Sequence, residues 1–343
     1  MKIKCIVWDL DHTLWDGVLL ENDNLAVRNQ VEKIIFCASD KGIINSICSK
    51  NIFEEAKSKL QEFGLWDYFV YPQISFNDKS DLISNISRRL HILPRNILVI
   101  DDDVFERNEI KYHIPEINVE SGADMNAIYL LISQYPTVST SESKERLTLY
   151  RNEERRIRAE DSFSGSSREF LDFCNFQMVA RRGLEEDAPR IAELIERAHQ
   201  LSFNVGKYTK EEIINMVRNK LYSVFVISVK DRFGEYGLCG VSIISMQQPM
   251  LDAFVISCRL LGKGVSQEFM SFIKNKLQAW GYNTLLCRFR RNQYNREMIV
   301  LLQMNSFSKC GGVSSTGIDV YKCTLEGTSK NSSWIKVVDL VDD

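Results

Sequence analysis

Short apolar segments alternate with longer segments of helical periodicity throughout the first 135 residues of this chain. The apolar segments lie at 3–8, 42–49, 68–71, 96–100 and 117–119, and the helical ones at 30–39, 52–63, 79–90, 104–113 and 125–134. Short continuous apolar runs are typical of strands buried on both faces. Their alternation with helices predicts a doubly wound parallel α/β sheet, in which reactive groups belong at the carboxyl ends of the strands.

The later part of the chain predicts a second domain, of mixed α/β type with antiparallel strands. Strands are expected at 222–228, 240–246, 251–258, 284–289 and 321–325, and amphipathic helices at 184–198 and 265–277. A length of 343 residues also favours two domains. The expected parts are a doubly wound domain (1–135), a linker with an exposed helix (136–168), the mixed α/β domain (169–326) and a polar tail (327–343).

The composition is that of a soluble globular protein, with 44% hydrophobic and 26% charged residues. A formal net charge of −3 argues against a dedicated nucleic-acid binder. No apolar segment reaches the roughly 18 residues that a membrane span needs, and the first apolar segment is too short for a signal peptide. The nine cysteines show no Cys-x-x-Cys spacing, which disfavours a disulfide framework or a zinc site. We therefore expect a cytoplasmic protein with reduced thiols.

Polar side chains follow several of the predicted strands. They are Asp9 and Asp11 after the first strand, Ser49, Lys50 and Asn51 after the second, Lys79 at a helix start, and Asp101 and Asp102 after the strand at 96–100. Carboxylates crowded together need a cation or a shared proton. If these strand ends converge, the four acids are candidate Mg²⁺ ligands and the other four residues are candidate phosphate-binding groups.

This residue set meets the needs of phosphoryl transfer. Asp9 would be the carboxylate nucleophile, and Asp11 would protonate the leaving oxygen and later activate water. Any one of these pieces alone is more often structural, but their order and their positions at strand ends favour function. The set resembles the haloacid-dehalogenase (HAD) superfamily, with its DxDxT motif, strand-end Ser, distal Lys and strand-end acidic pair. No long insertion follows Thr13 or Ser49, so no large cap is expected, and an open site suits a bulky or protein-tethered substrate.

A glycine-containing turn in the second half follows the strand that ends at Cys258. The sequence from Arg259 to Gly264 has the spacing R-x-x-G-x-G, and a predicted helix begins at Val265. Successive backbone N–H groups at a helix start suit a phosphate. The turn resembles the acyl-CoA loop of GNAT acyltransferases, which bind the phosphopantetheine arm between two splayed strands. This resemblance makes Arg259, Gly262, Lys263 and Gly264 candidate pantetheine-binding residues.

Two longer segments, 256–265 and 198–209, extend the likeness. Together with the first-half motifs they resemble the FkbH-like family of polyketide biosynthesis over about residues 1–325. The resemblance implies that 1,3-bisphosphoglycerate is dephosphorylated and that its glyceryl group is loaded as a thioester onto an acyl carrier protein. His12 and His199 stand where that family commonly has Asn.

Retaining the activation of an acyl phosphate requires a thiol. Attack at phosphorus would release free glycerate, whereas a thiolate that attacks the carbonyl carbon conserves the activated acyl group, unless the carrier's own thiol attacks directly. Cys258 is the candidate because it ends the strand beside the glycine turn. Its strand face is shared with Phe254 and Ile256, where a cysteine is more often part of the core than catalytic, whereas the FkbH-like resemblance favours function. His199 is a possible base, although a histidine at a helix end is often a cap.

Two arginine groups are candidates for steering an acidic carrier protein. They are Arg288, Arg290, Arg291 and Arg296 in the second domain, and Arg151, Arg155, Arg156 and Arg158 in the linker. Two other functions stay open. One is a Mg²⁺-dependent phosphatase whose second domain only docks a partner. The other is an acetyltransferase with a relic first domain, which the complete set of HAD-type residues disfavours.

Overall fold

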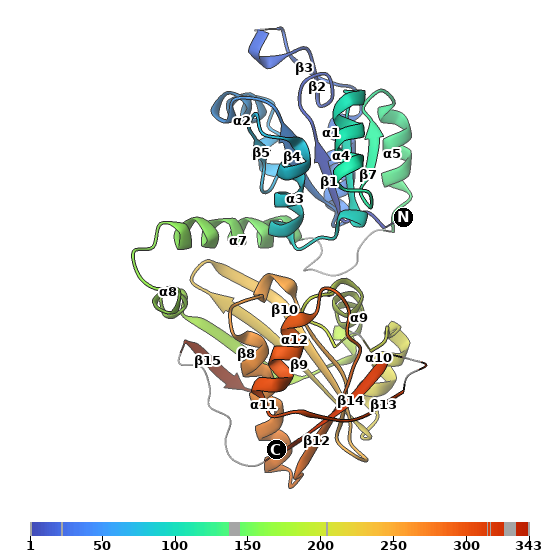
Figure 1. Cartoon of the computed structure of the whole chain (residues 1–343), viewed down its shortest axis with the longest axis vertical. Coiled ribbons are helices and arrows are strands. Elements are labelled where there is room, and N and C mark those ends of the chain that lie inside the picture. Colours follow the sequence, from blue (N-terminus) through green and yellow to red (C-terminus); the bar gives the residue numbers. More distant parts are fainter. Residues whose placement is uncertain are drawn as a thin grey trace. The chain divides into compact units, whose positions relative to one another are not determined.

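The computed structural model describes residues 2–21, 23–136, 145–203, 205–313, 315, 317–325 and 334–341. The chain forms two compact units, residues 1–155 and 156–343, which are taken separately here (Figure 1). The division falls inside the segment 136–168 that was expected to be a linker. In the described parts of the chain, every helix is too short or too polar to span a lipid bilayer.

The first unit contains a five-stranded parallel sheet in the order β5-β4-β1-β6-β7. Its strands are β1 (Cys5–Trp8), β4 (Ile44–Ser49), β5 (Gln73–Ile74), β6 (Ile97–Asp101) and β7 (Asn118–Ser121). Every residue of the three central strands, β4, β1 and β6, is buried. The predicted doubly wound parallel sheet is therefore confirmed.

Four helices connect these strands and a fifth follows β7, each within two residues of its predicted bounds. They are α1 (Val31–Asp40), α2 (Phe53–Glu62), α3 (Lys79–Leu90), α4 (Val104–His113) and α5 (Met125–Ser133). Side-chain caps determine where two of them begin: Asp103 accepts a hydrogen bond from Phe105 N, and Asp124 accepts one from Ala127 N. Alternate β1 residues, Ile6 and Trp8, share one core with α1 and α5.

The strand predicted at 68–71 is wrong. A 3₁₀ helix (Trp66–Tyr68) occupies its first position, and only Phe69 forms an isolated bridge, to Asn45. Tyr71 has a positive φ of 50°, and Pro72 has no N–H to donate. These two residues end the extended backbone and delay the edge strand β5. A small antiparallel pair, β2 (Trp15–Asp16) with β3 (Ala26–Val27), was not predicted.

The helix expected to be exposed in the linker is α7 (Arg146–Asp161), and part of it is packed. Leu149 and Tyr150 are buried, and the Tyr150 hydroxyl donates to Leu90 O at 3.1 Å. Arg146 Nη1 donates to Gly42 O at 2.7 Å. The first half of α7 is thus part of the first unit, and the expectation of an exposed helix is corrected for these residues.

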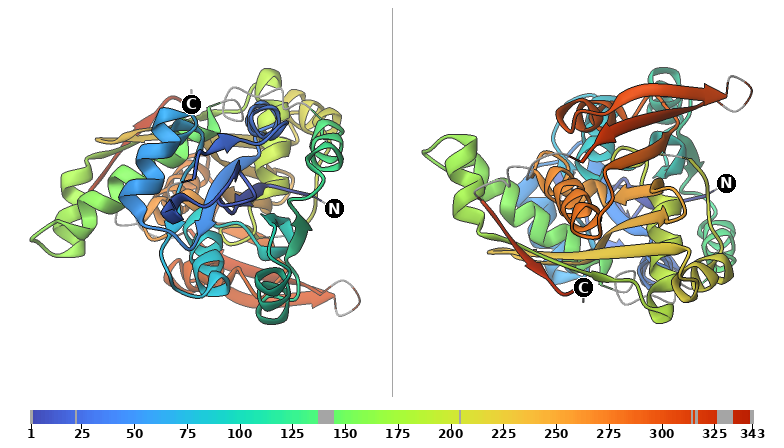
Figure 2. Two further views of the ribbon diagram at one scale, coloured as in Figure 1. Left: turned by 90° about the horizontal axis from the view of Figure 1, so that it is seen from above. Right: turned by 90° about the horizontal axis from the view of Figure 1, so that it is seen from below.

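The second unit contains an eight-stranded mixed sheet in the order β13-β14-β12-β11-β10-β9-β8-β15. Its strands are β8 (Phe176–Arg182), β9 (Tyr222–Asp231), β10 (Gly234–Ser245), β11 (Met250–Ile256), β12 (Thr284–Phe289), β13 (Ser308–Val313), β14 (Ile318–Thr324) and β15 (Ile335–Asp339). Pairing is antiparallel except between β11 and β12 and between β8 and β15. This confirms the predicted mixed α/β type, and Figure 2 (right) shows β12, β13 and β14 together.

The helices of the second unit are α8 (Ser167–Cys174), α9 (Ala188–Arg197), α10 (Lys210–Arg218), α11 (Val265–Ala279) and α12 (Arg296–Met304). Phe225, Phe254 and Phe269 belong to its main core, on the sheet face that α11 covers. The expected polar tail contains β15, which pairs in parallel with β8 from Ile335 opposite Phe176. That part of the tail is a strand of the sheet, whereas 327–333 and 342–343 lie outside the described residues.

Candidate active sites

The carboxyl ends of β1 and β6 bring three carboxylates together. One oxygen each of Asp9, Asp101 and Asp102 lies within 4.8 Å of the others, a spacing that could hold a metal ion. Asp9 and Asp101 are buried, and Asp102 is exposed. The parallel order of the sheet explains the convergence, because β1 and β6 are neighbours and end at the same edge.

Lys79 lies between two of these carboxylates. Its Nζ is 3.2 Å from Asp9 Oδ1 and 2.6 Å from Asp101 Oδ2, and the side chain is buried. Burial lowers the pKa of Lys79, but the charges of Asp9 and Asp101 and the hydrogen bond to Asp101 raise it above its usual value. The ammonium group therefore stays protonated and offsets part of the negative charge of the cluster.

One lysine does not neutralise this cluster. Burial, together with the charge of the neighbouring Asp101, raises the pKa of Asp9 to about 7 against the lowering effect of Lys79. Burial also raises the pKa of Asp101. Buried carboxylates that resist ionisation mark a place where a cation is electrostatically favourable. Three carboxylate donors suit a hard cation such as Mg²⁺, so this residue set fits that ion.

The Asp11 carboxylate has a different environment and is not one of the three clustered carboxylates. Its Oδ1 accepts hydrogen bonds from Trp15 Nε1 at 2.8 Å and from Leu19 N at 3.0 Å. Its Oδ2 accepts from Asn51 Nδ2 at 2.9 Å. Three donors from three segments thus orient this carboxylate, an arrangement that suits a group whose position must be held while it exchanges a proton.

The predicted phosphate-binding residues divide into two groups. Ser49 and Asn51 are buried at the end of β4, and Asn51 Nδ2 also donates to Ser49 Oγ at 3.3 Å. Lys50 instead pairs with Glu106 of α4 at 2.6 Å, and this hydrogen bond raises its pKa. Ser49, which hydrogen-bonds to Asp9, and Lys79 are therefore at the acidic cluster. Asn51 contacts Asp11, and the ammonium of Lys50 is bound to α4.

Two residues that the sequence interpretation did not assign hold the acidic loop in place. Thr13 Oγ1 donates to Asp102 Oδ1 at 3.0 Å and accepts from Asp102 N at 2.9 Å. Arg107 Nη1 donates to the carbonyls of Asp101 and Asp102 at 2.7 and 2.6 Å. The position of Thr13 in the DxDxT motif is a sequence signal for such a role. Arg107 lies in a helix and belongs to no motif, so the sequence gives no signal for its role.

A second candidate site lies where β11 and β12 separate. The two strands pair only at Met250–Leu286 and Leu251–Cys287. Beyond this point the segment Leu201–Phe203 lies between them: Phe203 N donates to Phe254 O, Ile256 N donates to Leu201 O, and Arg290 N donates to Phe203 O. The Phe203 ring contacts Phe254 and Phe289 at centroid distances of 5.1 and 5.7 Å. The chain itself therefore fills the opening expected to receive a pantetheine arm.

Cys258 does not end the strand, contrary to the sequence prediction. Ser202 forms an antiparallel bridge with Val255, but β11 ends at Ile256, before Cys258. Cys258 is partly buried and opens a 3₁₀ helix (Cys258–Leu260), while the His199 ring lies edge-on to Tyr294 at 5.6 Å.

The glycine turn has the expected backbone but not the expected side-chain directions. Gly262 and Gly264 have φ values of 75° and 81°, which favour glycine, and α11 begins directly afterwards. Arg259 is buried and donates to Tyr236 O at 3.2 Å, and Lys263 Nζ donates to Arg259 O at 2.6 Å. A ligand at this turn would therefore meet backbone N–H groups rather than these two cations.

The arginine groups are only partly available to a partner. The Arg156 side chain is 3% exposed and pairs at 2.6 Å with Asp231, whose side chain is fully buried, so the expected role of Arg156 in steering a carrier is corrected. Arg151 pairs with Asp67, and Arg288 pairs with Asp252 at 2.7 Å. The remaining arginines are exposed or partly exposed: Arg155, Arg158, Arg290, Arg291 and Arg296.

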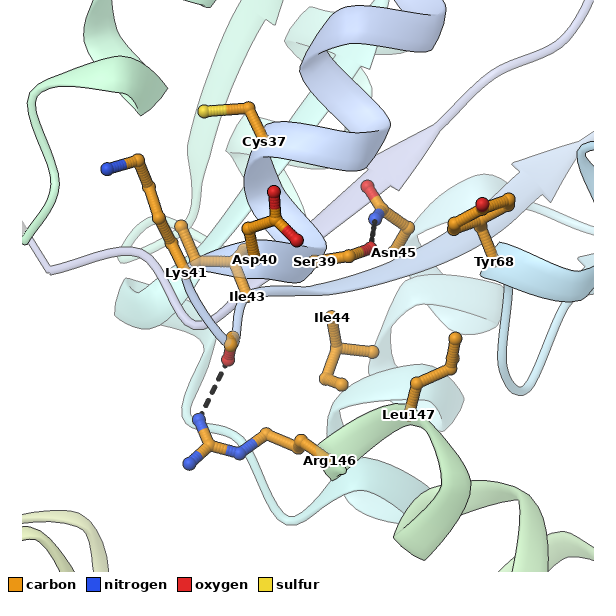
Figure 3. A pocket seen from close by; sticks show the side chains of 11 residues that line it. Cys37, Ser39, Asp40, Lys41, Ile43, Ile44, Asn45, Tyr68, Arg146 and Leu147 are labelled. Carbon is orange, nitrogen blue, oxygen red and sulfur yellow. Dashed lines mark hydrogen bonds between the residues drawn. The ribbon is translucent and has the colours of Figure 1, made fainter. Parts of the chain in front are cut away.

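A cavity of about 650 Å³ lies at the opposite edge of the first unit's sheet, where β4 begins (Figure 3). Ile44 and Asn45 of β4, the end of α1 and the start of α7 line it. The dashed bond between Arg146 and Gly42 O borders it. Because β4 runs from this cavity to Ser49, the cavity lies away from the acidic cluster.

No protein-family model and no curated protein matches this chain. One similar solved structure is the N-terminal part of a Bacteroides fragilis protein, containing a phosphatase domain complexed with Mg. It is 26% identical over 40% of this chain and 42% of that one, less than half its length, with a TM-score of 0.35.

Two acetyltransferases are also similar. A spermidine N-acetyltransferase variant from Vibrio cholerae is 14% identical over 43% of this chain and 94% of its own, with a TM-score of 0.35. An N-acetyltransferase from Staphylococcus aureus is 17% identical over 43% of this chain and 99% of its own, with a TM-score of 0.34. The fold class itself stands on the two sheets described above.

Proposed function

We propose that this protein is a Mg²⁺-dependent phosphatase coupled to acyl transfer, acting in a polyketide-type pathway. Its substrate is 1,3-bisphosphoglycerate, and its product is a glyceryl thioester on the phosphopantetheine of an acyl carrier protein, as the FkbH-like resemblance implies. The observation that carries the phosphatase half is Lys79, buried between Asp9 and Asp101 beside Asp102. The identity of the acyl group and of the carrier rests on the resemblance.

The phosphatase chemistry follows from the chain's own residues. An Asp9 oxygen attacks phosphorus while the bond from phosphorus to the substrate oxygen breaks, and Asp11 gives that oxygen its proton. Water then attacks the phosphoaspartate, Asp11 takes a proton from it, and inorganic phosphate leaves. Lys79 offsets the charge of Asp9, and Ser49 is a donor for the phosphate oxygens. Asp9, Asp101 and Asp102 would hold Mg²⁺, which offsets the remaining negative charge.

The acyl transfer is assigned to Cys258. Its thiolate attacks the carbonyl carbon of the acyl phosphate, the bond from that carbon to the phosphate oxygen breaks, and phosphate leaves. The carrier's thiol then attacks the thioester and Cys258 departs as thiolate. His199 is assigned as the group that takes the proton of the attacking thiol.

One observation favours a second candidate, a phosphatase whose second unit only docks a partner. The segment Leu201–Phe203 bonds to both sides of the opening between β11 and β12, where a pantetheine arm would otherwise lie. In this alternative neither Cys258 nor a carrier affects phosphate release, and no acyl adduct forms.

Phosphate release and intact-protein mass spectrometry separate these candidates. Asp9→Asn should abolish phosphate release from the phosphomonoester, whereas Glu116→Gln, which makes the same carboxylate-to-amide change at an exposed position, should not. Removing Mg²⁺ with EDTA should stop the reaction, and returning it should restore activity.

With 1,3-bisphosphoglycerate, a glyceryl or phosphoglyceryl adduct should form on the wild type and on Cys310→Ala, a change at an exposed cysteine, but not on Cys258→Ala. Phosphate release without an adduct on the enzyme or on a supplied carrier would support the second candidate instead.

A further inference from the structure

Two side-chain atoms on neighbouring segments of the second unit are buried without a hydrogen-bond partner. They are Gln200 Oε1 and Arg290 Nε. Gln200 comes directly before the segment Leu201–Phe203, and Arg290 comes directly after Phe289, the last residue of β12. A buried donor or acceptor that stays unpaired costs free energy, and most such groups in folded proteins are paired. The two atoms therefore indicate a place where a ligand group would be stabilised.

Hydrogen bonds hold these two segments side by side. Arg290 N donates to Phe203 O at 2.9 Å. The fully buried Asn295 donates from Nδ2 to Ser202 O at 3.1 Å and to Arg290 O at 3.0 Å. Both backbone polar groups of Arg290 are thus fixed, and Gln200 lies two residues before Ser202. The two side chains therefore extend from a backbone whose position is already determined, which lowers the entropy lost when a ligand binds.

The guanidinium of Arg290 differs from its paired neighbours. It is only partly exposed, yet among the described residues it takes part in no hydrogen bond, ion pair or ring contact. By contrast, Arg288 pairs with Asp252 at 2.7 Å, and Arg259 donates to Tyr236 O at 3.2 Å. A guanidinium keeps its charge at any physiological pH, and its parallel N–H groups match two oxygens of one phosphate or carboxylate. Arg290 is therefore suited to bind an anion.

The charge of the two segments and the amide of Gln200 select the kind of anion. Residues 198–210 and 288–296 contain six lysines and arginines and no acidic residue. Such an excess of positive charge favours a doubly charged phosphate over a singly charged carboxylate. A hydroxyl group both donates and accepts, so it can satisfy either polar atom of the Gln200 amide. The ligand that meets both requirements has a phosphate and, close to it, a hydroxyl group.

We propose that Arg290 and Gln200 form a binding site for a hydroxylated phosphate ester in the second unit. Arg290 binds two phosphate oxygens, and Gln200 binds the hydroxyl group. Two compounds of the proposed function share this chemistry, a three-carbon phosphoglycerate and the phosphopantetheine arm of a carrier. The site goes beyond the proposed function, because it assigns Arg290 the binding of a small anion instead of the steering of a carrier, and it is separate from the acidic cluster of the first unit.

The test is calorimetric binding of 3-phosphoglycerate and of 4′-phosphopantetheine to the full chain in EDTA, where metal-dependent hydrolysis is stopped. At least one of the two should bind, and Arg290→Gln should weaken that binding at least about ten-fold, because it removes the charged pair of donors. Arg291→Gln, the same change at the exposed neighbouring position, should weaken it less than about three-fold. Gln200→Leu should weaken it at least about three-fold, whereas Gln303→Leu, at an exposed position of α12, should not.

Urea unfolding without ligand separates a binding site from a structural role. Since the Arg290 side chain has no partner in the described part of the chain, Arg290→Gln should unfold at the same or a higher urea concentration than the wild type. A lower unfolding midpoint in that variant would indicate a structural role and overturn the inference.

Three binding results would also overturn it: no binding of either compound, equal losses in Arg290→Gln and Arg291→Gln, or unchanged binding in Gln200→Leu. Binding that depends on Arg290 supports the site, and the compound that binds identifies the source of the phosphate. Phosphate release by the acidic cluster takes no part in these measurements, so a failure of the proposed phosphatase would leave their result unchanged.

Discussion

At the scale of single residues, the two acids of the DxD pair have been given different environments by the fold. Asp9 is buried with Lys79 and other carboxylates, whereas Asp11 accepts hydrogen bonds from Trp15, Leu19 and Asn51. A nucleophile and an acid–base group need this separation of roles. Two measurements address the two environments independently.

The first measurement concerns the protonation of the Asp9 carboxyl group and its effect on stability. Its pKa is raised by burial from 3.8 to about 7, so between these values the folded metal-free protein binds more protons than the unfolded chain. The free energy of unfolding should therefore fall as pH rises through this window. Urea unfolding in EDTA at pH 4.5, 6 and 8 would measure it. Asp9→Asn should flatten the fall, and an equal slope in that variant would contradict the assignment.

The second measurement concerns Trp15, a fully buried residue whose Nε1 donates a hydrogen bond to Asp11 Oδ1. Trp15→Phe keeps most of the ring volume and removes the N–H, so Asp11 loses one of its three orienting bonds. We expect kcat for phosphate release to fall about ten-fold, with KM changed less than about two-fold. Steady-state kinetics would test this, with Trp66→Phe as the control. A change confined to KM would instead indicate a role in substrate binding.

At the scale of elements, the segment Leu201–Phe203 acts as a short extra strand between β11 and β12. Its backbone bonds satisfy groups on both strands, and Phe203 is fully buried between two other phenylalanines. No sequence periodicity announces such a segment, because its partners lie about 50 and 90 residues away and the contacts are made by backbone atoms.

Removing this side chain should weaken the segment. Phe203→Ala should lower the free energy of unfolding by about 3–5 kcal/mol, the usual cost of truncating a buried phenylalanine. It should also raise the affinity for coenzyme A above that of the wild type, as measured by calorimetry. Phe173→Ala, at a position 38% exposed, is the control. Tight binding of coenzyme A by the wild type would show that the segment moves aside readily.

At the scale of the whole molecule, the first unit was more predictable than the second. Its central strands are buried on both faces, so β1, β4 and β6 are continuous apolar runs, and the acids at their ends follow from parallel topology. Edge strands carry no such signal. β13 contains Gly311 and Gly312, and β15 alternates weakly, so both were missed. The pairing of Lys50 with Glu106 joins residues 56 positions apart, which a local motif cannot indicate.

A buried ion pair at the start of the second unit contributes to the stability of that unit. Arg156, the first residue of the second unit, forms a buried ion pair with Asp231 and stacks over Tyr236 at 4.8 Å. Arg156→Ala leaves Asp231 buried without its cation and should cost the second unit about 3–5 kcal/mol. Hydrogen exchange of the β9 and β10 backbone amides in increasing denaturant, followed by mass spectrometry, would measure this for the second unit. Arg158→Ala, at an exposed position of the same helix, should cost little.

The helix α7 runs without interruption across residues 155 and 156. Expression of either unit alone therefore requires a boundary that does not fall at residues 155 and 156. Severing the chain at the formal division would take Tyr150 and Arg156 onto different fragments, each with a frayed half-helix. Fragments that overlap, both carrying all of 146–161, are the sensible starting point.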